Sequence, residues 1–263
     1  MALIRCDFYS DALNVSTSMA VLLPERTSSP TGMGGAPAAA AAPSFPVLYL
    51  LHGLSDDHTA WLRRTALERY VDTLGLAVVM PSVSRSFYTD EALGLDYWTF
   101  LADELPTKVE SMFRVSDRRE DRFVAGLSMG GYGAMKWALR RPDRFAAAAS
   151  LSGALDLARI QRDRHRAEDP RMMQRLFADG VVAGSDDDLL HLLGTVADPP
   201  ALYVACGTED YLVDDNHRFV NACAAADVEL TSDFGPGAHD WAYWDATIQD
   251  VLAWLPLGSR DLV

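Results

Sequence analysis

Short, uninterrupted apolar runs alternate with longer, partly polar stretches over most of the chain. The run at residues 46–51 reads Pro-Val-Leu-Tyr-Leu-Leu, which is typical of a strand buried on both faces of a parallel sheet. Runs of the same kind follow at 76–80, 123–125, 145–150 and 201–206. Helical patterns lie between several of these runs, at 60–73, 98–113 and 133–141. Strands that alternate with helices predict an α/β fold, with a mostly parallel central sheet and helices on both faces.

Three further stretches depart from this rhythm. Residues 3–9 alternate apolar and polar positions, residues 15–23 are mostly apolar, and the turn between them predicts a pair of strands. Residues 27–44 are rich in Ala, Pro, Gly and Ser, which predicts a flexible surface loop. Residues 156–195 are polar and irregular, and we expect them to cover the functional site. The length suits a single domain over residues 1–263.

The charge balance narrows the classes of partner. Lys and Arg together number 23 against 37 Asp and Glu, which gives a formal net charge of −14. This charge would repel nucleic acid and anionic membrane surfaces, so we expect neither as a partner, and a small molecule instead. No apolar run is long enough to span a membrane, and the first residues lack a signal-peptide pattern, so a cytoplasmic location is expected. Assembly into a homo-oligomer is compatible with the sequence.

Metal and cofactor chemistry find no support in the sequence. The spacing of Cys6, Cys206 and Cys223 predicts small buried hydrophobic residues rather than a disulfide framework or a zinc site. The chain has no phosphate-binding loop and no dinucleotide-binding glycine pattern, so no cofactor is expected. The acidic run Asp186-Asp187-Asp188 predicts the solvated start of a helix rather than a site.

The most informative motif is Gly126-Leu127-Ser128-Met129-Gly130, which matches the pattern G-x-S-x-G. This pattern places a serine at a sharp turn between a strand and a helix, the nucleophile elbow. Glycines on either side leave room where the strand and the helix nearly touch. The context agrees, because residues 122–126 predict a buried strand and residues 133–141 a helix that ends before a proline. Ser128 is therefore the candidate nucleophile.

A serine hydroxyl needs a base to take its proton and an acid to orient that base. In hydrolases with this elbow the chain order is Ser, then Asp or Glu, then His. His239 suits the base, because it follows the strand-like residues 228–234 near the end of the chain. The other histidines either come too early in the chain or predict solvated positions; they are His52, His58, His165, His191 and His217.

Asp210 is the favoured acid, because the predicted strand at 201–206 leads directly to it. Its rivals are Glu209, which would point the opposite way at an extended strand end, and Asp214 and Asp215. Those last two carboxylates predict charges in the first turn of a helix.

Acyl transfer also needs donors for a negatively charged oxygen. The first candidate is the backbone N–H of Met129, at the positive end of the helix after the elbow. The second is the N–H of Leu54, in the turn after the strand at 46–51. Aromatic residues gather near these loops and are expected mostly to pack the core; they are Trp61, Phe87, Tyr88, Tyr97, Trp98, Trp241, Tyr243 and Trp244.

Further stretches extend the elbow to a resemblance that runs from about residue 45 to residue 244. They are residues 47–54, His58 with Trp61-Leu62, and residues 78–81, 88–90, 125–133, 152–154 and 239–244. With them the chain resembles the putative esterase (esterase D-like) family of α/β hydrolases, and within it the bacterial tributyrin and acetyl esterases. The chain departs from those esterases in its insertion at 27–44.

The resemblance implies an α/β-hydrolase fold with a Ser128–Asp210–His239 triad and with Leu54 and Met129 as oxyanion-hole donors. It implies a serine carboxylesterase that acts on short acyl esters, acetyl to butyryl, through an acyl-enzyme. The same family contains S-formylglutathione hydrolases and acyltransferases, which stay as alternatives. A catalytically inactive binding protein of the same fold is an alternative from another class, although such a protein should lack part of the triad.

Overall fold

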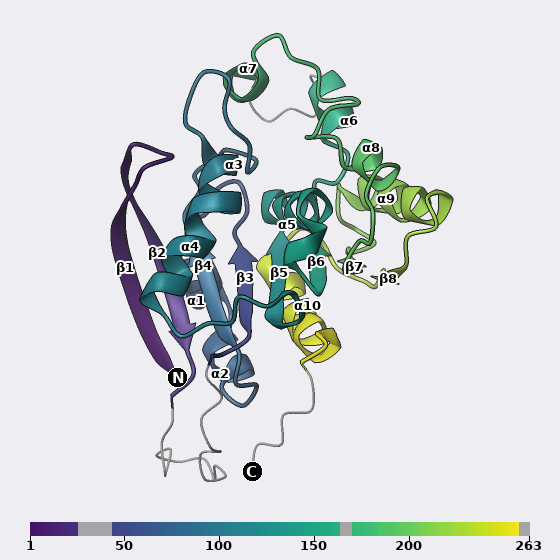
Figure 1. Ribbon diagram of the computed structural model, residues 1–263. Helices are drawn as coiled ribbons and strands as arrows, with labels where there is room; N and C mark the ends of the chain where they lie inside the picture. Colours follow the sequence, from purple (N-terminus) through teal and green to yellow (C-terminus); the bar gives the residue numbers. More distant parts are fainter. Residues whose placement is uncertain (26–43, 164–169, 258–263) are drawn as a thin grey trace.

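A single twisted sheet crosses the whole molecule (Figure 1). The computed structural model describes residues 1–25, 44–163 and 170–257. Within these residues the sheet has eight strands in the spatial order β1-β2-β4-β3-β5-β6-β7-β8. The strands are β1 (Ala2–Ser10), β2 (Val15–Leu23), β3 (Val47–Leu51), β4 (Ala77–Pro81), β5 (Arg122–Leu127), β6 (Ala147–Leu151), β7 (Ala201–Ala205) and β8 (Leu230–Asp233). Strand β2 runs antiparallel to β1 and β4, and every other pair is parallel, so the predicted mostly parallel sheet is confirmed.

The central strands are apolar at every position because both of their faces are covered. All five residues of β3 are buried. Leu48 and Leu50 belong to one apolar core, whereas Val47, Tyr49 and Leu51 belong to the other. Successive side chains of a strand point to opposite faces, so a strand with helices on both sides requires apolar residues throughout.

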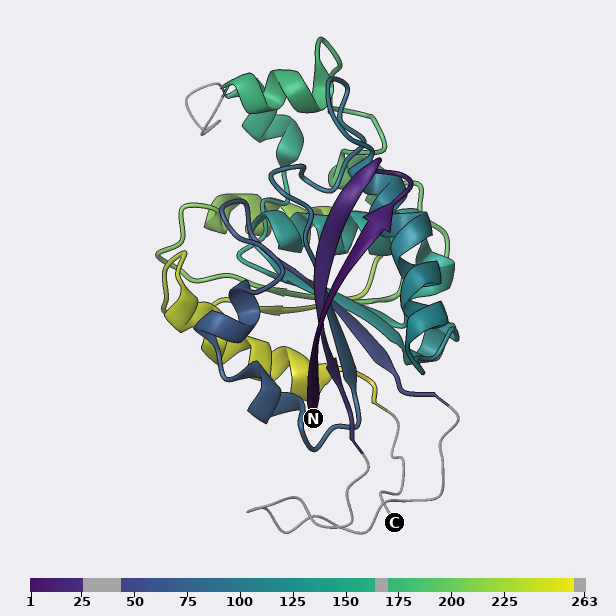
Figure 2. The ribbon, with the colours of Figure 1, turned by 90° about the vertical axis from the view of Figure 1, so that its left-hand side faces the viewer.

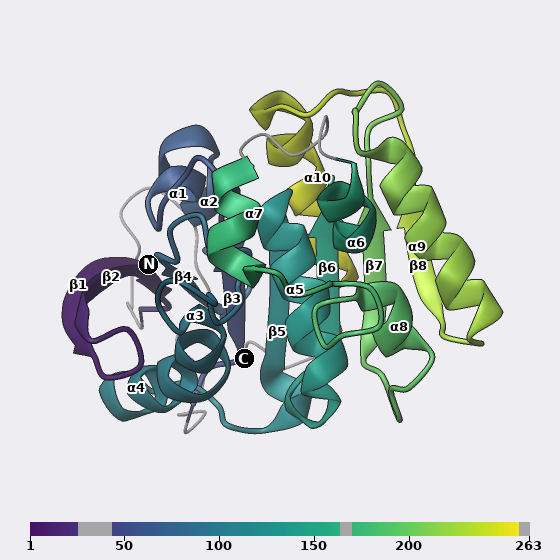
Figure 3. The same ribbon diagram turned by 90° about the horizontal axis from the view of Figure 1, so that it is seen from above.

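Helices cover both faces of the sheet (Figure 2, Figure 3). One core includes side chains of α1 (Ala60–Arg64), α2 (Leu67–Val71) and α10 (Trp241–Trp254). The opposite core includes side chains of the remaining helices, which are α3 (Tyr97–Thr99), the π-helical segment Phe100–Glu104, α4 (Leu105–Met112), α5 (Met129–Arg140), α6 (Leu157–Arg162), α7 (Pro170–Phe177), α8 (Leu189–Leu193) and α9 (Val213–Ala225). Short 3₁₀ turns occur at Arg119–Asp121 and Pro142–Arg144. None of the helices in the described part of the chain has the length and apolar character needed to cross a membrane.

Two predicted helices are interrupted by local chemistry. The helix expected at 60–73 is divided into α1 and α2, because the Thr65 hydroxyl donates to the Trp61 carbonyl at 2.6 Å and accepts from the Leu67 N–H at 3.1 Å. The Leu67 N–H thus donates to a side chain in place of the backbone carbonyl that would continue the helix, while the Thr65 N–H still donates to the Trp61 carbonyl at 3.1 Å. The helix expected at 98–113 contains a π-helical segment, which ends where α4 begins. The second residue of α4 is Pro106, which lacks the N–H that a regular helix would use there.

The structure describes only one of the two irregular regions, 27–44 and 156–195, in any detail. Of residues 27–44 only Ser44 lies within the described part of the chain, so the predicted loop falls outside it. The described residues of 156–195 include α6, α7 and α8, which makes this segment more helical than its polar sequence suggests. Helix α6 begins with a side-chain cap, because the Asp156 carboxylate accepts from the Arg159 N–H at 2.9 Å.

The parallel strands deliver the candidate residues to one edge of the sheet. Strand β3 leads to Leu54, β5 to Ser128, β7 to Asp210 and β8 to His239. The carboxyl ends of parallel strands lie at the same edge, where ligands of α/β sheets ordinarily bind. The fold therefore brings together residues that are distant in sequence, such as Ser128 and His239, which are 111 positions apart.

Candidate active site

Ser128 lies in a strained turn between β5 and α5. Its backbone adopts φ 54° and ψ −118°, a left-handed conformation that residues with a side chain rarely take. Neighbouring glycines permit this turn. A Cβ atom at Gly126 would lie 2.4 Å from the Gly130 carbonyl carbon, and one at Gly130 would lie 2.5 Å from the Leu51 carbonyl oxygen. Strand, helix and the end of β3 thus meet too closely for any other residue.

The structure brings Ser128, His239 and Asp210 into one hydrogen-bonded row. His239 Nε2 lies 3.0 Å from Ser128 Oγ, and His239 Nδ1 lies 2.8 Å from Asp210 Oδ2. The Asp210 side chain is fully buried, whereas the His239 ring is 15% exposed. An imidazole between a hydroxyl and a carboxylate is the arrangement that lets the ring accept the hydroxyl proton and retain a fixed orientation.

Asp210 is held in its ionised form. Burial alone would raise the pKa of this carboxyl, but hydrogen bonds from His239 and from the Leu212 N–H outweigh it, and the pKa falls below its ordinary value. The carboxylate therefore remains able to accept the Nδ1 proton of His239, which leaves Nε2 free to accept a proton from Ser128.

The loops that carry Asp210 and His239 are fastened to each other. The Glu209 carboxylate accepts from the Gly237 N–H at 2.6 Å, and the Glu209 N–H donates to the Gly237 carbonyl at 3.0 Å. The contact is so close that a Cβ atom at Gly207 would lie 2.0 Å from the Gly237 carbonyl oxygen. Glu209 thus points away from the histidine, as the sequence predicts, and it positions the loops instead.

Beside Ser128 the surface opens into a small apolar cavity of about 130 Å³. Segments from several distant parts of the chain line it, with residues Leu54, Phe87, Ser128, Met129, Ala154, Ile160, Met172, Met173, Tyr211 and Leu212. A larger open groove of about 480 Å³ lies next to Leu3 and Leu62 and includes none of the candidate residues. The small cavity therefore lies where a group that reacts with Ser128 would bind.

Both candidate oxyanion donors, Leu54 and Met129, line this cavity with Ser128. Among the described residues, neither of their backbone N–H groups donates to another backbone carbonyl. Met129 is the first residue of α5, where the helix dipole favours negative charge. The structure thus places two amides beside the cavity, and their role as donors stays a prediction.

His52 braces the turn that leads to Leu54, a role that the sequence did not indicate. Its ring is buried, and its Nε2 accepts from the Val83 N–H at 3.1 Å. The other nitrogen, Nδ1, therefore carries the proton and donates to the Gly53 carbonyl at 2.7 Å. Burial lowers the pKa of His52 to about 4, so the ring stays neutral.

Two aromatic rings enclose the His239 imidazole. The Tyr211 ring centroid lies 4.6 Å from that of His239, and the Trp244 centroid lies 4.9 Å away in an edge-on arrangement. Trp244 is buried, as expected of a core residue, whereas Tyr211 is 58% exposed and lines the cavity. Tyr211 directly follows the predicted acid in the chain, but nothing in its local sequence indicates the contact with His239.

The competing candidates lie outside this row. His191 and His217 are exposed on α8 and α9, as predicted, and His165 lies outside the described residues. Asp214 and Asp215 lie in the first turn of α9, as predicted. Cys206 and Cys223 are buried, and Cys6 is half-buried.

The prediction for the acidic run 186–188 is wrong at Asp187. Asp188 does cap α8, but the Asp187 carboxylate forms an ion pair with the buried Lys136. A cation hidden on α5 attracts this carboxylate, and nothing in the local sequence around either residue reveals the other.

The sequence profile of the family described as "Putative esterase" matches residues 10–255 of the chain. The chain belongs to this family. The esterase is 29% identical to an acetyl esterase of Caldicellulosiruptor saccharolyticus over 97% of this chain and 98% of that protein. It is a serine hydrolase of the α/β-hydrolase fold.

Two solved structures from Staphylococcus aureus resemble the esterase closely. The fluorophosphonate-binding serine hydrolase FphF superimposes with a TM-score of 0.87 at 32% identity, over 98% of this chain and 99% of that one. The S-formylglutathione hydrolase FrmB superimposes with a TM-score of 0.82, also at 32% identity and with the same coverage.

The contact at Gly207 yields a test of how tightly the esterase must hold its loops. We expect Gly207→Ala to push the Asp210 and His239 loops apart and to lower kcat for p-nitrophenyl acetate by about a hundredfold, the cost of a displacement of about 1 Å. Gly235→Ala is the matched control, because its Cβ would meet no atom within 4 Å. Equal kcat values for the two variants, with unfolding temperatures compared in parallel, would contradict this account.

Proposed function

We propose that the esterase hydrolyses short-chain acyl esters, acetyl to butyryl, through an acyl-enzyme intermediate. The observation that carries this proposal is the row Ser128–His239–Asp210, with its distances of 3.0 and 2.8 Å beside an apolar cavity. The acetyl esterase of Caldicellulosiruptor saccharolyticus, which matches over nearly the whole chain, points to the same substrate class.

Acylation would begin with proton transfer from the Ser128 hydroxyl to His239 Nε2. The oxygen forms a bond to the acyl carbon, and the carbonyl electron pair moves onto the carbonyl oxygen, which the Leu54 and Met129 N–H groups stabilise. When this intermediate collapses, the bond to the alcohol breaks, and His239 returns its proton to the departing oxygen. Asp210 stays ionised and stabilises the imidazolium while it exists.

Deacylation would repeat these steps with water in place of the serine. His239 Nε2 takes a proton from water as the water oxygen attacks the acyl carbon. The same amides stabilise the second negatively charged oxygen. Collapse releases the carboxylic acid and returns the proton to Ser128 Oγ. All bonds and protons of the reaction are accounted for by the ester, water and the protein side chains.

The size of the cavity supports a short acyl chain. Its volume of about 130 Å³ is far below the roughly 300–1,000 Å³ of pockets that enclose drug-sized ligands. Phe87, Met172 and Met173 line it, and all three are nearly fully buried. The two methionines lie on α7, within residues 156–195, which supports the prediction that this segment covers the site.

A thioesterase acting on S-formylglutathione is the second candidate, because FrmB shares the fold at 32% identity. It would use the same three side chains, with a thiolate as the leaving group. We expect kcat/KM for p-nitrophenyl acetate to exceed that for S-formylglutathione, measured side by side under the same conditions. A preference for the thioester would replace the proposed ester substrate while leaving the proposed mechanism intact.

Ser128→Ala tests the mechanism itself. Loss of the nucleophile should lower kcat for p-nitrophenyl acetate by about 10⁴- to 10⁶-fold, while the unfolding temperature stays close to that of the wild type. A fluorophosphonate probe should label the wild type at Ser128 and leave the variant unlabelled. Undiminished turnover in Ser128→Ala would refute the proposed mechanism, and an unlabelled wild type would indicate a binding protein.

Acyl-chain length tests the cavity. Across p-nitrophenyl esters from acetyl to octanoyl, kcat/KM should peak between acetyl and butyryl. Met173→Ala should shift the peak to longer chains, because it enlarges the cavity where the acyl group lies. Met112→Ala is the control, since Met112 is exposed on α4. A wild-type maximum at octanoyl would show that the acyl group lies elsewhere.

A further inference from the structure

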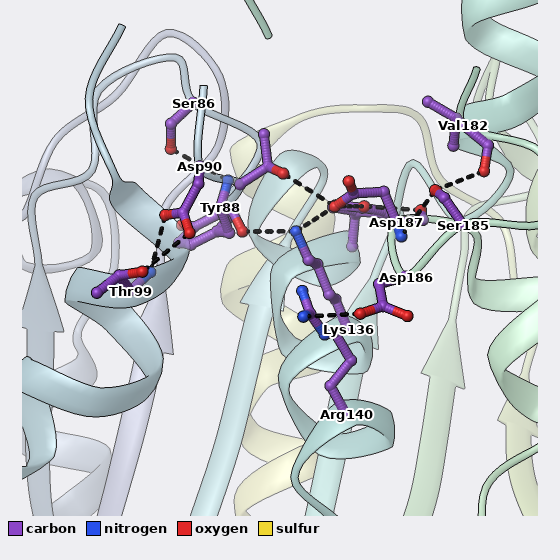
Figure 4. A network of polar contacts seen from close by, with 12 residues as sticks. Ser86, Tyr88, Asp90, Thr99, Lys136, Arg140, Val182, Ser185, Asp186 and Asp187 are labelled. Carbon is purple, nitrogen blue, oxygen red and sulfur yellow. Dashed lines mark hydrogen bonds and ion pairs between the residues drawn. The ribbon is translucent and has the colours of Figure 1, made fainter. Parts of the chain in front are cut away.

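A fully buried lysine lies on the helix that follows the nucleophile. Lys136 is 0% exposed and stands about two helical turns beyond Ser128 on α5. Its ammonium donates to the Tyr88 carbonyl at 2.8 Å and forms an ion pair with Asp187 (Figure 4). One cation thus joins α5, the loop at 84–90 and the turn before α8.

Burial of this cation is costly, and an apolar side chain could fill the same space. Burial lowers the pKa of Lys136 to about 8, although the Asp187 carboxylate acts in the opposite direction. Replacing a buried ion pair by apolar residues is often neutral or stabilising for a fold. Core packing therefore does not explain why this position is a lysine. The explanation lies in the two groups that the ammonium binds, the Tyr88 carbonyl and the Asp187 carboxylate.

The loop that Lys136 grips has a strained backbone. Phe87 and Tyr88 both have left-handed conformations, with φ 47° and 52°. Such residues persist only where their surroundings hold them. The Tyr88 N–H donates to the Ser86 hydroxyl at 3.1 Å, and the ammonium of Lys136 binds the carbonyl of the same residue. The aromatic ring of Tyr88 lies so close to α5 that a Cβ at Gly133 would approach it within 2.4 Å.

This loop contacts the active site in two ways. Phe87 lines the cavity beside Ser128. The Tyr88 hydroxyl donates to the His52 carbonyl at 2.9 Å. Val83, just before the loop, donates from its N–H to the His52 ring at 3.1 Å. His52 is therefore held at both its carbonyl and its ring, only two residues before Leu54.

We propose that Lys136 is a positioning residue for the Leu54 N–H. It fixes the loop at 84–90, and through Tyr88 and His52 this loop sets where the Leu54 N–H lies relative to the reacting carbonyl oxygen. This inference rests on the proposed function. Lys136, Asp187 and Tyr88 do not line the cavity, so their effect on the transition state is indirect, through the position of the Leu54 N–H. Loss of the contact would weaken oxyanion stabilisation more than substrate binding.

The chain supplies a matched control for the ion pair. Arg140, one turn farther along α5, binds Asp186 at 2.9 Å, so it also joins α5 to the turn before α8 (Figure 4). The Asp186 side chain is 70% exposed, and an ion pair in contact with water contributes little. For the tyrosine the control is Tyr49→Phe, because the buried Tyr49 hydroxyl has no hydrogen-bond partner among the described residues.

The experiment compares kcat and KM for p-nitrophenyl acetate, together with unfolding temperatures, in Lys136→Met, Tyr88→Phe, Arg140→Met and Tyr49→Phe. We expect kcat to fall about tenfold to a hundredfold in the first two with KM nearly unchanged, since a shifted donor weakens only the transition state. Inhibition by a trifluoromethyl ketone, whose adduct carries an oxyanion, should weaken in parallel with kcat. The two control variants should keep wild-type kcat.

Wild-type kcat in a folded Lys136→Met variant would overturn the inference directly. Two other outcomes would also overturn it. One is wild-type kcat in Tyr88→Phe, which decides the matter should Lys136→Met fail to fold. The other is full recovery of kcat in the double variant Lys136→Met with Asp187→Leu, which would show that the pair serves stability alone. Failure of the proposed function is distinguishable, because it would appear as turnover in Ser128→Ala whatever these variants do.

Discussion

The esterase is organised around the close approach of three backbone segments, where β5 ends, α5 begins and β3 turns away. Gly126, Gly130 and the Leu51 carbonyl lie nearly in contact, and this contact holds Ser128 in its left-handed conformation. The same close approach puts the first amide of α5 beside the turn after β3. One backbone contact therefore positions both the nucleophile and the candidate oxyanion donors.

The acid and the base depend on a second close contact, between the loops after β7 and β8. The two loops meet at glycines, Gly207 and Gly237. Glu209 joins them twice, because its backbone N–H donates to the Gly237 carbonyl and its carboxylate accepts from the Gly237 N–H. Asp210 and His239 are consequently held by rigid segments at the ends of neighbouring strands. In this position the His239 ring lies within hydrogen-bond distance of both Asp210 and Ser128.

Contacts that do not involve Ser128, His239 or Asp210 hold the lining of the cavity in place. Helix α6, which contributes Ile160, is tied to α9 by two crossed ion pairs, Arg159–Asp215 at 2.5 Å and Arg218–Asp156 at 2.7 Å. Both carboxylates are buried, so these pairs are better fixed than surface pairs of the same length. Phe87, another lining residue, lies in the loop at 84–90, where the buried Lys136 donates to the carbonyl of the next residue, Tyr88.

The order of apolar runs along the chain was enough to predict the parallel sheet, and the elbow motif with its downstream acid and histidine was enough to predict which side chains converge at its edge. These features depend on short segments and on chain order, which a sequence displays directly. The break at Thr65, the support from His52 and Tyr211, and the pairing of Lys136 with Asp187 were decided by the tertiary structure alone. Each arises from a partner distant in sequence or from a competition among nearby polar groups, and only the folded chain determines which contact forms.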